Sequence, residues 1–400
     1  MSMPSNPTDP RAAGEVGSIP LCVPQITGNE WLYLKQCLDD NWVSSGGSFV
    51  GQFEEVMAGF VGSNHGVAVQ NGTAALHIAL MVAGVEADDE VLVSDLTFIA
   101  PANAVRYIGA WPVFMDAEPD YWQMDPTKVA DFLVNECRWQ DGKLVNKVTG
   151  RRVKAILPVH ILGHPCDMDP IIEIAERYEL AVVEDATESL GATYKGVMAG
   201  NIGDIGCLSF NGNKLITTGG GGMIVTGNSG WAERASYLTT QAKDDPVEYY
   251  HREIGYNYRL TNIQAAMGVA QMENIDDFIA KKRLIARAYE AGFSDAEGIT
   301  VMSTQTSVDA THWLYTVLLP EDIDLEGRKS AVTYLNENGV GARPLWHPIH
   351  ALPPYQDCQG YRIENSLDLY RRAVSLPSSV GLTAEDQQTA IETLKSCPEI

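Results

Sequence analysis

Short apolar runs alternate with amphipathic segments along the first half of the chain. The runs are rich in β-branched residues and end at polar turns, which is typical of strands buried on both faces of a sheet. The pattern predicts strands at residues 66–69, 90–93, 112–115, 153–157, 181–183 and 205–210. It predicts helices at residues 99–107, 126–135 and 170–178. This alternation indicates an α/β fold with a mostly parallel sheet.

Segments outside this pattern suggest how the chain is divided. Residues 141–152 (DGKLVNKVTGRR) are polar and carry turn signals, so we expect a surface hairpin there. A helical pattern from residue 262 to about residue 293 predicts the connection to a smaller C-terminal domain. The expected division is a flexible tail at residues 1–18, a large domain at 19–275 and a small domain at 276–400.

Composition argues for a globular protein and against several other classes of protein. A chain of 400 residues with 45% hydrophobic content can bury a large core. A formal net charge of −24 argues against a nucleic-acid partner, because phosphates require a basic face. The seven cysteines lack the paired spacing of a disulfide framework or a metal site, which favours a reducing cytoplasm. We expect no membrane span, because the apolar stretch at residues 74–85 is too short, and no signal peptide.

Lys214 is the first candidate for chemistry. It follows a polar loop after an expected strand and precedes four consecutive glycines, residues 219–222, so it looks placed to touch a small planar molecule. A lysine amine whose site lowers its pKa can form a Schiff base with an aldehyde cofactor. The alternative is a solvated surface group, which is what most lysines beside polar turns are.

A strand that ends in two carboxylates provides the second candidate. Residues 180–183 are apolar and lead into Glu184 and Asp185. Ligands of open α/β sheets bind outside the carboxyl ends of the strands, and successive strand residues point to opposite faces. Only one of the two acids can therefore face a given ligand, where it would keep a pyridine nitrogen protonated. The alternative for Asp185 is a cap of the following turn.

A third candidate is the turn Asn71-Gly72-Thr73, which follows an expected strand and opens a helical segment. Free N–H groups at the start of a helix favour an anion such as phosphate. The alternative is that Thr73 is an ordinary capping residue.

Along the chain, the turn, the carboxylates and the lysine follow one another in an order that resembles the fold-type I pyridoxal-phosphate sugar aminotransferases of the DegT–DnrJ–StrS family. The resemblance runs from about Ile19 to the C-terminus. It is carried by WVSSG at residues 42–46, NGT at 71–73, LTF at 96–98, PVHILG at 158–163, EDA at 184–186, SFNGNK at 209–214 and GYNYR at 255–259. It implies a large domain with a mostly parallel sheet flanked by helices and a smaller C-terminal α+β domain. It also implies pyridoxal 5'-phosphate as cofactor, with pyridoxamine 5'-phosphate as the intermediate form.

The resemblance assigns roles residue by residue. Lys214 matches the Schiff-base lysine, and Asp185 matches the partner of the pyridinium nitrogen. The other matched cofactor contacts are Gly72, Thr73 and Ser209 for the phosphate, Phe98 for stacking on the ring, and Asn257 for the phosphate of the neighbouring subunit. A homodimer with an active site shared across the interface follows from the last match. The alternatives are a core position for Phe98 and a turn position for Asn257.

Glu188 departs from the family pattern. Many relatives have His or Gln there, which can donate a hydrogen bond to the phenolic oxygen of the cofactor, whereas an ionised glutamate only accepts. Either Glu188 is protonated or it binds the incoming sugar.

The resemblance also implies the substrates, L-glutamate and a nucleotide-linked keto sugar. Residues 96–104, 159–165 and 343–350 look most like the subgroup that aminates UDP-4-keto-6-deoxy-N-acetylglucosamine at the 4-keto carbon. The candidate substrate contacts are Trp42, His160, Arg343, Trp346, His347 and His350. His347 and His350 could instead satisfy local backbone groups.

Three functions compete at this stage. The first is the nucleotide-sugar aminotransferase. The second is another enzyme of the same scaffold, such as an aminotransferase for a GDP- or dTDP-keto sugar or for a cyclitol, or a sugar dehydratase. Dehydratases of this scaffold replace the Schiff-base lysine by histidine, so Lys214 favours transamination. The third is a non-catalytic sensor that binds the cofactor.

Overall fold

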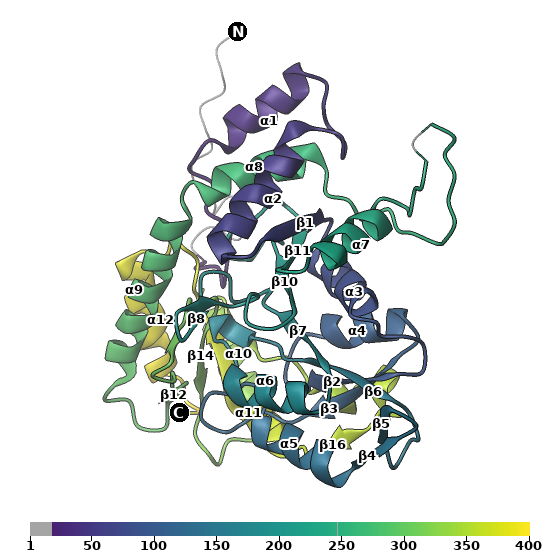
Figure 1. The fold of residues 1–400 in the computed structure, drawn as a ribbon. Coiled ribbons are helices and arrows are strands. Elements are labelled where there is room, and N and C mark those ends of the chain that lie inside the picture. The colour runs from purple at the N-terminus through teal and green to yellow at the C-terminus, as the bar shows by residue number, and fades with distance from the viewer. Residues whose placement is uncertain (1–17, 246) are drawn as a thin grey trace.

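The computed structural model describes residues 18–245 and 247–400, and an eight-stranded sheet forms its centre (Figure 1). The strands are β1 (His65–Val69), β2 (Glu90–Ser94), β3 (Trp111–Met115), β6 (Val153–Leu157), β7 (Ala181–Asp185), β10 (Ile205–Ser209), β11 (Gly222–Thr226) and β16 (Gly360–Tyr361). Their order in the sheet is β1-β11-β10-β7-β6-β2-β3-β16. Only β11 runs antiparallel to its neighbours in this sheet. The expected α/β fold with a mostly parallel sheet is confirmed.

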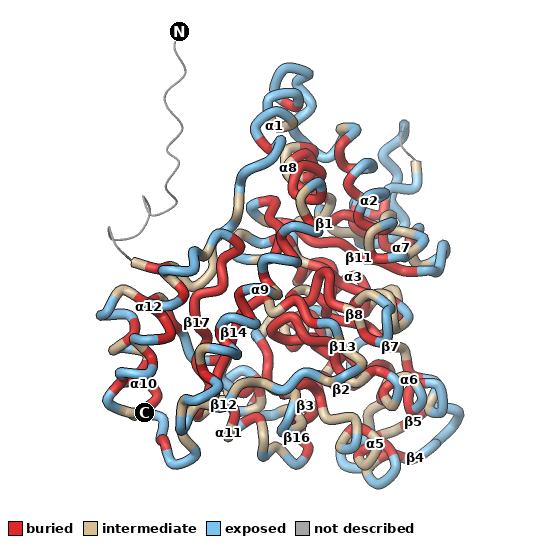
Figure 2. The backbone as a smooth tube through the Cα atoms, turned by 90° about the vertical axis from the view of Figure 1, so that its left-hand side faces the viewer, coloured by how far each residue is buried: buried red, intermediate tan, exposed pale blue. Residues whose placement is uncertain are grey.

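Helices cover both faces of this sheet, because alternate residues of each strand point to opposite sides. Val91 and Val93 of β2 pack in one apolar cluster, and Leu92 packs in another. The helices that share the cluster with Val91 are α3 (Gly72–Val82), α4 (Ala100–Tyr107) and α7 (Ser229–Thr239). The helices on the other face are α2 (Ser48–Val61), α5 (Pro126–Asn135), α6 (Met168–Arg177) and α8 (Asn262–Met272). Figure 2 shows the buried strands between these exposed outer surfaces.

A second, four-stranded sheet lies in the C-terminal part of the chain. It contains β12 (Thr300–Val301), β14 (Tyr315–Leu318), β17 (Ala373–Leu376) and β15 (Arg343–Pro344), in that order. Its helices are α9 (Ile275–Phe293), α10 (Leu325–Glu337), α11 (Asn365–Arg372) and α12 (Ala384–Lys395). Smaller elements are α1 (Glu30–Asp39), the sheet of β8 (Thr193–Tyr194), β9 (Val197–Met198) and β13 (Val308–Asp309), and the 3-10 helices η2 (Ile161–Gly163), η3 (Ile349–Ala351) and η4 (Pro353–Tyr355).

Two segments cross the expected division at residue 275. Ile19 pairs with Val340 and packs in the core of the C-terminal sheet. Conversely, β16 adds an edge strand to the large sheet by pairing with β3. The domain boundaries stay a prediction, and neither region is a single continuous stretch of chain. The expected tail lies outside the described residues except for Ser18.

Two local expectations need correction. The hairpin begins earlier than expected, because β4 (Cys137–Gln140) and β5 (Lys143–Asn146) pair across a turn at Asp141-Gly142, where both residues have positive φ. The expected long helix is two helices, α8 and α9. They separate because α8 packs against α1 and α2, whereas α9 packs against α12.

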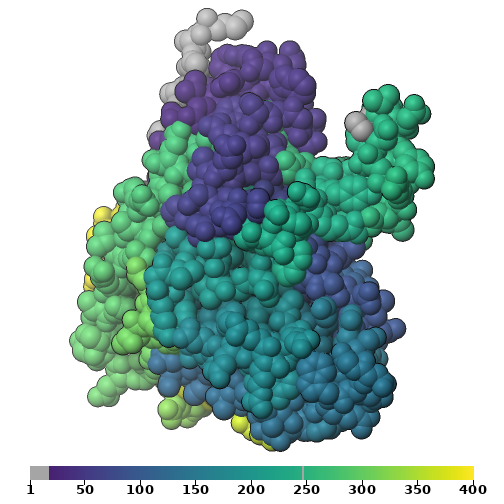
Figure 3. Space-filling model, in the orientation of Figure 1, coloured from purple at the N-terminus to yellow at the C-terminus, as the bar shows by residue number. Residues whose placement is uncertain are grey.

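The segment after α7, at residues 240–245 and 247–256, projects from the body of the molecule (Figure 1 and Figure 3). Within residues 18–245 and 247–400, no helix combines the length and apolar character needed to cross a bilayer. The cytoplasmic location stays a prediction.

Candidate active site

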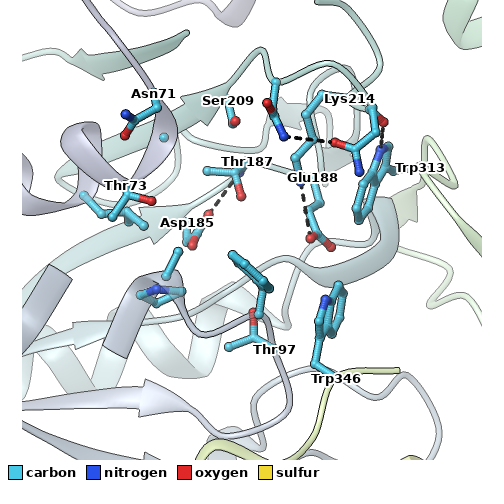
Figure 4. A pocket seen from close by; sticks show the side chains of 17 residues that line it. Asn71, Thr73, Thr97, Asp185, Thr187, Glu188, Ser209, Lys214, Trp313 and Trp346 are labelled. Carbon is cyan, nitrogen blue, oxygen red and sulfur yellow. Dashed lines mark hydrogen bonds and ion pairs between the residues drawn. The ribbon is translucent and has the colours of Figure 1, made fainter. Parts of the chain in front are cut away.

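A cavity of about 400 Å³ opens at the carboxyl ends of the parallel strands (Figure 4). The segments that follow β1, β2, β7 and β10 all reach it, because parallel strands end at the same edge of the sheet. Its lining consists of Asn71, Gly72, Thr73, Leu76, Thr97, Phe98, Ala100, Pro101, Asp185, Thr187, Glu188, Ser209, Asn211, Asn213, Lys214, Trp313 and Trp346. The three candidates of the sequence therefore meet in one cavity.

The start of α3 forms one end of this cavity. The cap of the helix is Asn71, whose Oδ1 accepts a hydrogen bond from the Ala74 N–H at 2.8 Å, so Thr73 is not the cap. A Cβ atom on Gly72 would lie 2.9 Å from Cβ of Ser209 and 3.0 Å from Cγ2 of Thr187. Only glycine lets the helix start approach these two side chains so closely. The positive end of the helix dipole faces this space, which favours an anion.

The four glycines at residues 219–222 do not line the cavity. Gly222 begins β11, and a Cβ atom there would lie 2.6 Å from the carbonyl carbon and oxygen of Asn71. The glycine therefore lets β11 pack directly behind the turn that opens α3. Its contribution to the site is to support this turn.

Asp185 ends β7 and is nearly fully buried while it faces the cavity. Its Oδ1 accepts a hydrogen bond from the Thr187 N–H at 3.1 Å. Burial raises the pKa of Asp185, against the opposing effects of Thr187 and of the Lys214 ammonium. A cationic group in the cavity would favour the ionised carboxylate further.

Glu184 points to the other side of β7. Its carboxylate accepts hydrogen bonds from the N–H groups of Gly200 at 2.9 Å, Ile202 at 2.6 Å and Gly203 at 2.6 Å. It does not line the cavity. The expected alternation of the two acids is what the structure shows, with Asp185 as the acid of the cavity.

Lys214 occupies the wall beside Glu188 and Trp313. Its Nζ lies 3.4 Å from Oε1 of Glu188 and 3.8 Å from the centroid of the Trp313 ring. The indole N–H of Trp313 donates to the carbonyl oxygen of Asn213 at 2.7 Å, which ties the ring to the lysine loop. The other Glu188 oxygen accepts from the Leu162 N–H at 2.9 Å. Burial raises the pKa of Glu188, and the Lys214 ammonium and this N–H oppose that rise.

The expected site residues fall into two groups. Eight of them line the cavity: Gly72, Thr73, Phe98, Asp185, Glu188, Ser209, Lys214 and Trp346. Six do not: Trp42, His160, Asn257, Arg343, His347 and His350. Trp42, Asn257 and Arg343 are exposed in the single chain, so their expected contacts stay predictions.

The histidines are placed differently from the expectation. His160 is fully buried, and its Nδ1 accepts a hydrogen bond from the Cys166 N–H at 3.1 Å. Its Nε2 must then carry the proton, which it donates to Glu184 at 2.9 Å. Both ring nitrogens form hydrogen bonds within the protein interior, so a substrate contact for His160 is not supported. The ring of His347 packs against that of Tyr370 at 4.8 Å, and His350 bonds to Asp95.

The sequence expectation missed several lining residues, notably Thr97, Thr187, Asn211, Asn213 and Trp313. Thr187 follows Asp185 closely, and Asn211 and Asn213 lie within the lysine loop, so proximity to the candidates could have indicated them. Trp313 is remote in sequence, and no local pattern marks it.

Comparisons with known proteins identify the family of this chain. The model of the DegT/DnrJ/EryC1/StrS aminotransferase family matches residues 24–395. A GDP-perosamine synthase of Caulobacter vibrioides is 38% identical over 378 residues, which cover 94% of this chain and 97% of the relative. A GDP-perosamine synthase of Escherichia coli O157:H7 is 39% identical over 368 residues, covering 92% and 95%. The crystal structure of DesI in the presence of its TDP-sugar product superposes with a TM-score of 0.84 at 28% identity and covers 95% of this chain and 93% of that chain. The chain therefore belongs to the DegT/DnrJ/EryC1/StrS aminotransferase family, whose members are pyridoxal-phosphate-dependent aminotransferases of nucleotide sugars.

Proposed function

We propose that this chain transfers the amino group of L-glutamate to the 4-keto carbon of a nucleotide-linked 6-deoxy sugar. The observation that carries the proposal is the meeting of Lys214, Asp185 and the start of α3 in one cavity. A lysine amine, a buried carboxylate and an anion-binding helix start are the three groups that this chemistry requires.

The cavity fits pyridoxal 5'-phosphate. Gly72 leaves free the space that a Cβ atom would fill beside Ser209, so the phosphate would be held by the start of α3, Thr73 and Ser209. Asp185 would hold the ring nitrogen, and Lys214 would hold the aldehyde carbon. When bound, the cofactor accepts the electron pair released at the substrate carbon and stores the amino group between the two half-reactions.

The side chains of this protein then have separate tasks. The Lys214 amine removes the proton from the α-carbon of glutamate and returns a proton to the sugar carbon in the second half-reaction. Asp185 stays ionised beside a cationic ring nitrogen, which offsets the cost of burying its charge. Phe98 and Trp346 line the cavity with aromatic rings from two other segments.

We propose that the Glu188 carboxyl is the hydrogen-bond partner of the Lys214 amine. Its Oε1 is within 3.4 Å of Nζ, and it lines the cavity between the lysine and the Leu162 backbone. In this position it can hold the amine while the cofactor carries the amino group.

The nucleotide is the less constrained part of the proposal. Segments 96–104, 159–165 and 343–350 pointed to UDP-4-keto-6-deoxy-N-acetylglucosamine. The two relatives above, similar to this chain over more than nine-tenths of its length, are GDP-perosamine synthases by name. Whole-chain similarity outweighs three short segments, so a GDP-linked sugar is the first candidate and the UDP-linked sugar the second.

A homodimer with a shared active site is part of the proposal. Phe98, which lines the cavity, is 54% exposed in the single chain. Asn257 lies near the base of the projecting segment and does not reach the cavity of its own chain. A second chain would cover the cavity and bring its own Asn257 to the phosphate end.

Absorbance spectroscopy tests the proposal. L-Glutamate should abolish the visible absorbance of the aldehyde form of the cofactor. The pyridoxamine form is then mixed separately with GDP-, UDP- and dTDP-linked 4-keto-6-deoxy sugars. We expect the GDP-linked sugar to restore the absorbance; restoration by the UDP-N-acetyl sugar alone would change the substrate and leave the reaction intact. No bleaching by glutamate would refute the proposed donor.

Lys214→Ala is the matching variant. It should keep the fold by circular dichroism, because the side chain lies at the cavity wall, and it should lose multiple turnover by about a thousandfold or more. Lys214→Arg serves as a control that keeps the positive charge but cannot form the Schiff base. Multiple turnover by either variant would overturn the role of Lys214.

A further inference from the structure

Two segments from distant parts of the chain meet at the cavity. The segment after β2 carries Thr97 and Phe98, and the segment before η3 carries Trp346. Asn71 and Trp346 lie at opposite ends of the pocket (Figure 4). Since the phosphate end is at Asn71, the end at Trp346 is left for the substrate, and a nucleotide sugar fills it more completely than glutamate does.

Asp95 and His350 join these two segments. The His350 N–H donates to Oδ1 of Asp95 at 2.9 Å, and Nδ1 of His350 lies 2.8 Å from Oδ2. The Ile349 N–H donates to the backbone oxygen of Asp95 at 3.2 Å. Asp95 is fully buried, whereas the His350 side chain keeps 23% of its surface exposed. The pair does not line the cavity, so any effect that it has on the pocket must pass through its neighbours in sequence.

The chemistry of the pair indicates a charged hydrogen bond. The hydrogen bond to Asp95 raises the pKa of His350 above its ordinary value, although burial opposes the rise, and the charges of Asp95 and Asp116 add to it. A ring N–H that donates to a buried carboxylate makes a short and directional hydrogen bond. A carboxylate left without this partner would be costly to bury.

Apolar packing alone would not fix the position of this segment. Ile349 is fully buried in a cluster with Ala102, Phe114 and Tyr355, which holds η3 on the large sheet. Apolar burial is non-directional, so it resists separation but tolerates small shifts and rotations. The hydrogen bonds between Asp95 and His350 are directional and remove that freedom. His350 follows Trp346 by four residues, and Asp95 precedes Thr97 by two, so the bonds fix the backbone close to both lining residues.

We propose that Asp95 and His350 form a clasp that positions Trp346 against the Phe98 segment and thereby shapes the sugar end of the pocket. His350 is thus a positioning residue and not the substrate contact that the sequence suggested. The identity of the ligand in this pocket rests on the proposed function, whereas the contact between Asp95 and His350 does not.

Hydrogen exchange of the cofactor-free protein, read by mass spectrometry, tests the clasp without any turnover. His350→Ala should speed exchange in peptides that cover residues 95–99 and 346–352 and leave the core strands β6 and β7 unchanged. His350→Asn keeps a side-chain N–H near the place of Nδ1 and should restore part of the protection. His65→Ala, in β1 and far from the clasp, is the control and should leave both peptides unchanged. Unaltered exchange in both segments of His350→Ala would overturn the clasp.

Kinetics of the two half-reactions test its effect on the pocket. A charged hydrogen bond is strong enough for its loss to raise KM for the keto sugar by about tenfold. The rate at which glutamate bleaches the cofactor should stay within about twofold, because glutamate does not depend on the Trp346 end. An equal loss in both half-reactions would overturn the specific role at the sugar end. Failure of the wild-type protein to react with glutamate would refute the proposed function, and the exchange experiment would still decide the clasp.

Discussion

At the residue scale, successive side chains of strand β7 point to opposite faces of the sheet, and this gives the adjacent acids Glu184 and Asp185 different roles. Asp185 faces the cavity with one backbone hydrogen bond, whereas Glu184 takes three backbone N–H groups and the His160 ring on the other face of the sheet. A carboxylate with four donors is satisfied and inert. Asp185 is left under-satisfied and is therefore the acid that a cationic ring nitrogen can stabilise.

Replacing Asp185 by Asn should separate stability from activity. Burial raises the pKa of Asp185, so the folded state binds its proton more tightly than the unfolded state does. Its favourable contribution is present at low pH and is lost as the pH rises through the folded-state pKa. Asp185→Asn should therefore raise the melting temperature of the cofactor-free protein by a few degrees, roughly 1 kcal/mol, with a larger gain at pH 8 than at pH 5.

The same variant should lose activity by about a hundredfold or more, because Asn cannot keep the ring nitrogen cationic. Thermal unfolding of the cofactor-free protein and steady-state kinetics check the two effects. Glu184→Gln is the comparison, and we expect it to destabilise the protein because it alters a fully bonded carboxylate. Near-normal turnover of Asp185→Asn would contradict the assignment.

At the element scale, the phosphate end of the cavity depends on contacts between α3, β10 and β11. Asn71 caps α3, Gly222 lets β11 pack behind the cap, and Gly72 lets the helix start approach Ser209. None of these approaches tolerates a Cβ atom without displacement of its neighbours. The anion site is thus built from small residues at the junction of three elements.

Gly72→Ala should test this junction. The added Cβ atom would meet Ser209 and Thr187 at 2.9 and 3.0 Å, which costs about 1–3 kcal/mol of overpacking and displaces the helix start. We expect a lower melting temperature and weaker cofactor affinity, measured by fluorescence titration. Gly59→Ala in α2 is the matched control, because nothing lies within 4 Å of its Cβ position. It should be neutral or stabilise the helix by up to about 1 kcal/mol. Equal cofactor affinity in both variants would contradict the proposed phosphate site.

At the scale of the whole molecule, apolar side chains gather on two exposed regions. A monomeric protein rarely exposes so many large apolar residues together. The region of α1 and the following turn exposes Trp31, Leu32, Leu38, Trp42 and Val43. The projecting segment exposes Val247, Tyr249, Tyr250 and Ile254. Under the proposed homodimer, a second copy of the chain would bury both regions and complete the cavity.

Ile254→Asp should therefore weaken self-association. Ile254 is 83% exposed in the single chain, so the substitution leaves the core unchanged and places a charge in the expected interface. Sedimentation velocity should give twice the mass of one chain for the wild type and a shift toward the monomer for the variant, with a parallel loss of activity. Val148→Asp, an equally apolar exposed site on the loop after β5, should keep the dimer. A monomeric wild type with full activity would refute the shared site.

The sequence by itself determined the sheet and the central chemistry of the site. Short apolar runs bounded by polar turns, such as residues 153–157, favour buried strands, because a run of this length suits a strand better than a helix. Parallel strands then bring their carboxyl ends together, which places Asp185 and Lys214 at one edge. The sequence did not reveal β11 as a strand of the large sheet, nor the antiparallel direction that lets it support the turn at Asn71.

Only the tertiary structure decided which residues of the C-terminal region line the cavity and which partners the histidines contact. Trp313 comes from the C-terminal region, and no pattern near it indicates contact with the lysine loop. Trp346 was a candidate through the family resemblance alone, and the packing of the chain places it at the cavity. His350 looked like a ligand contact until its partner Asp95 was placed beside it by the packing of η3 on the large sheet. Periodicity records which face of an element is buried, whereas contacts between distant segments depend on how the elements pack in three dimensions.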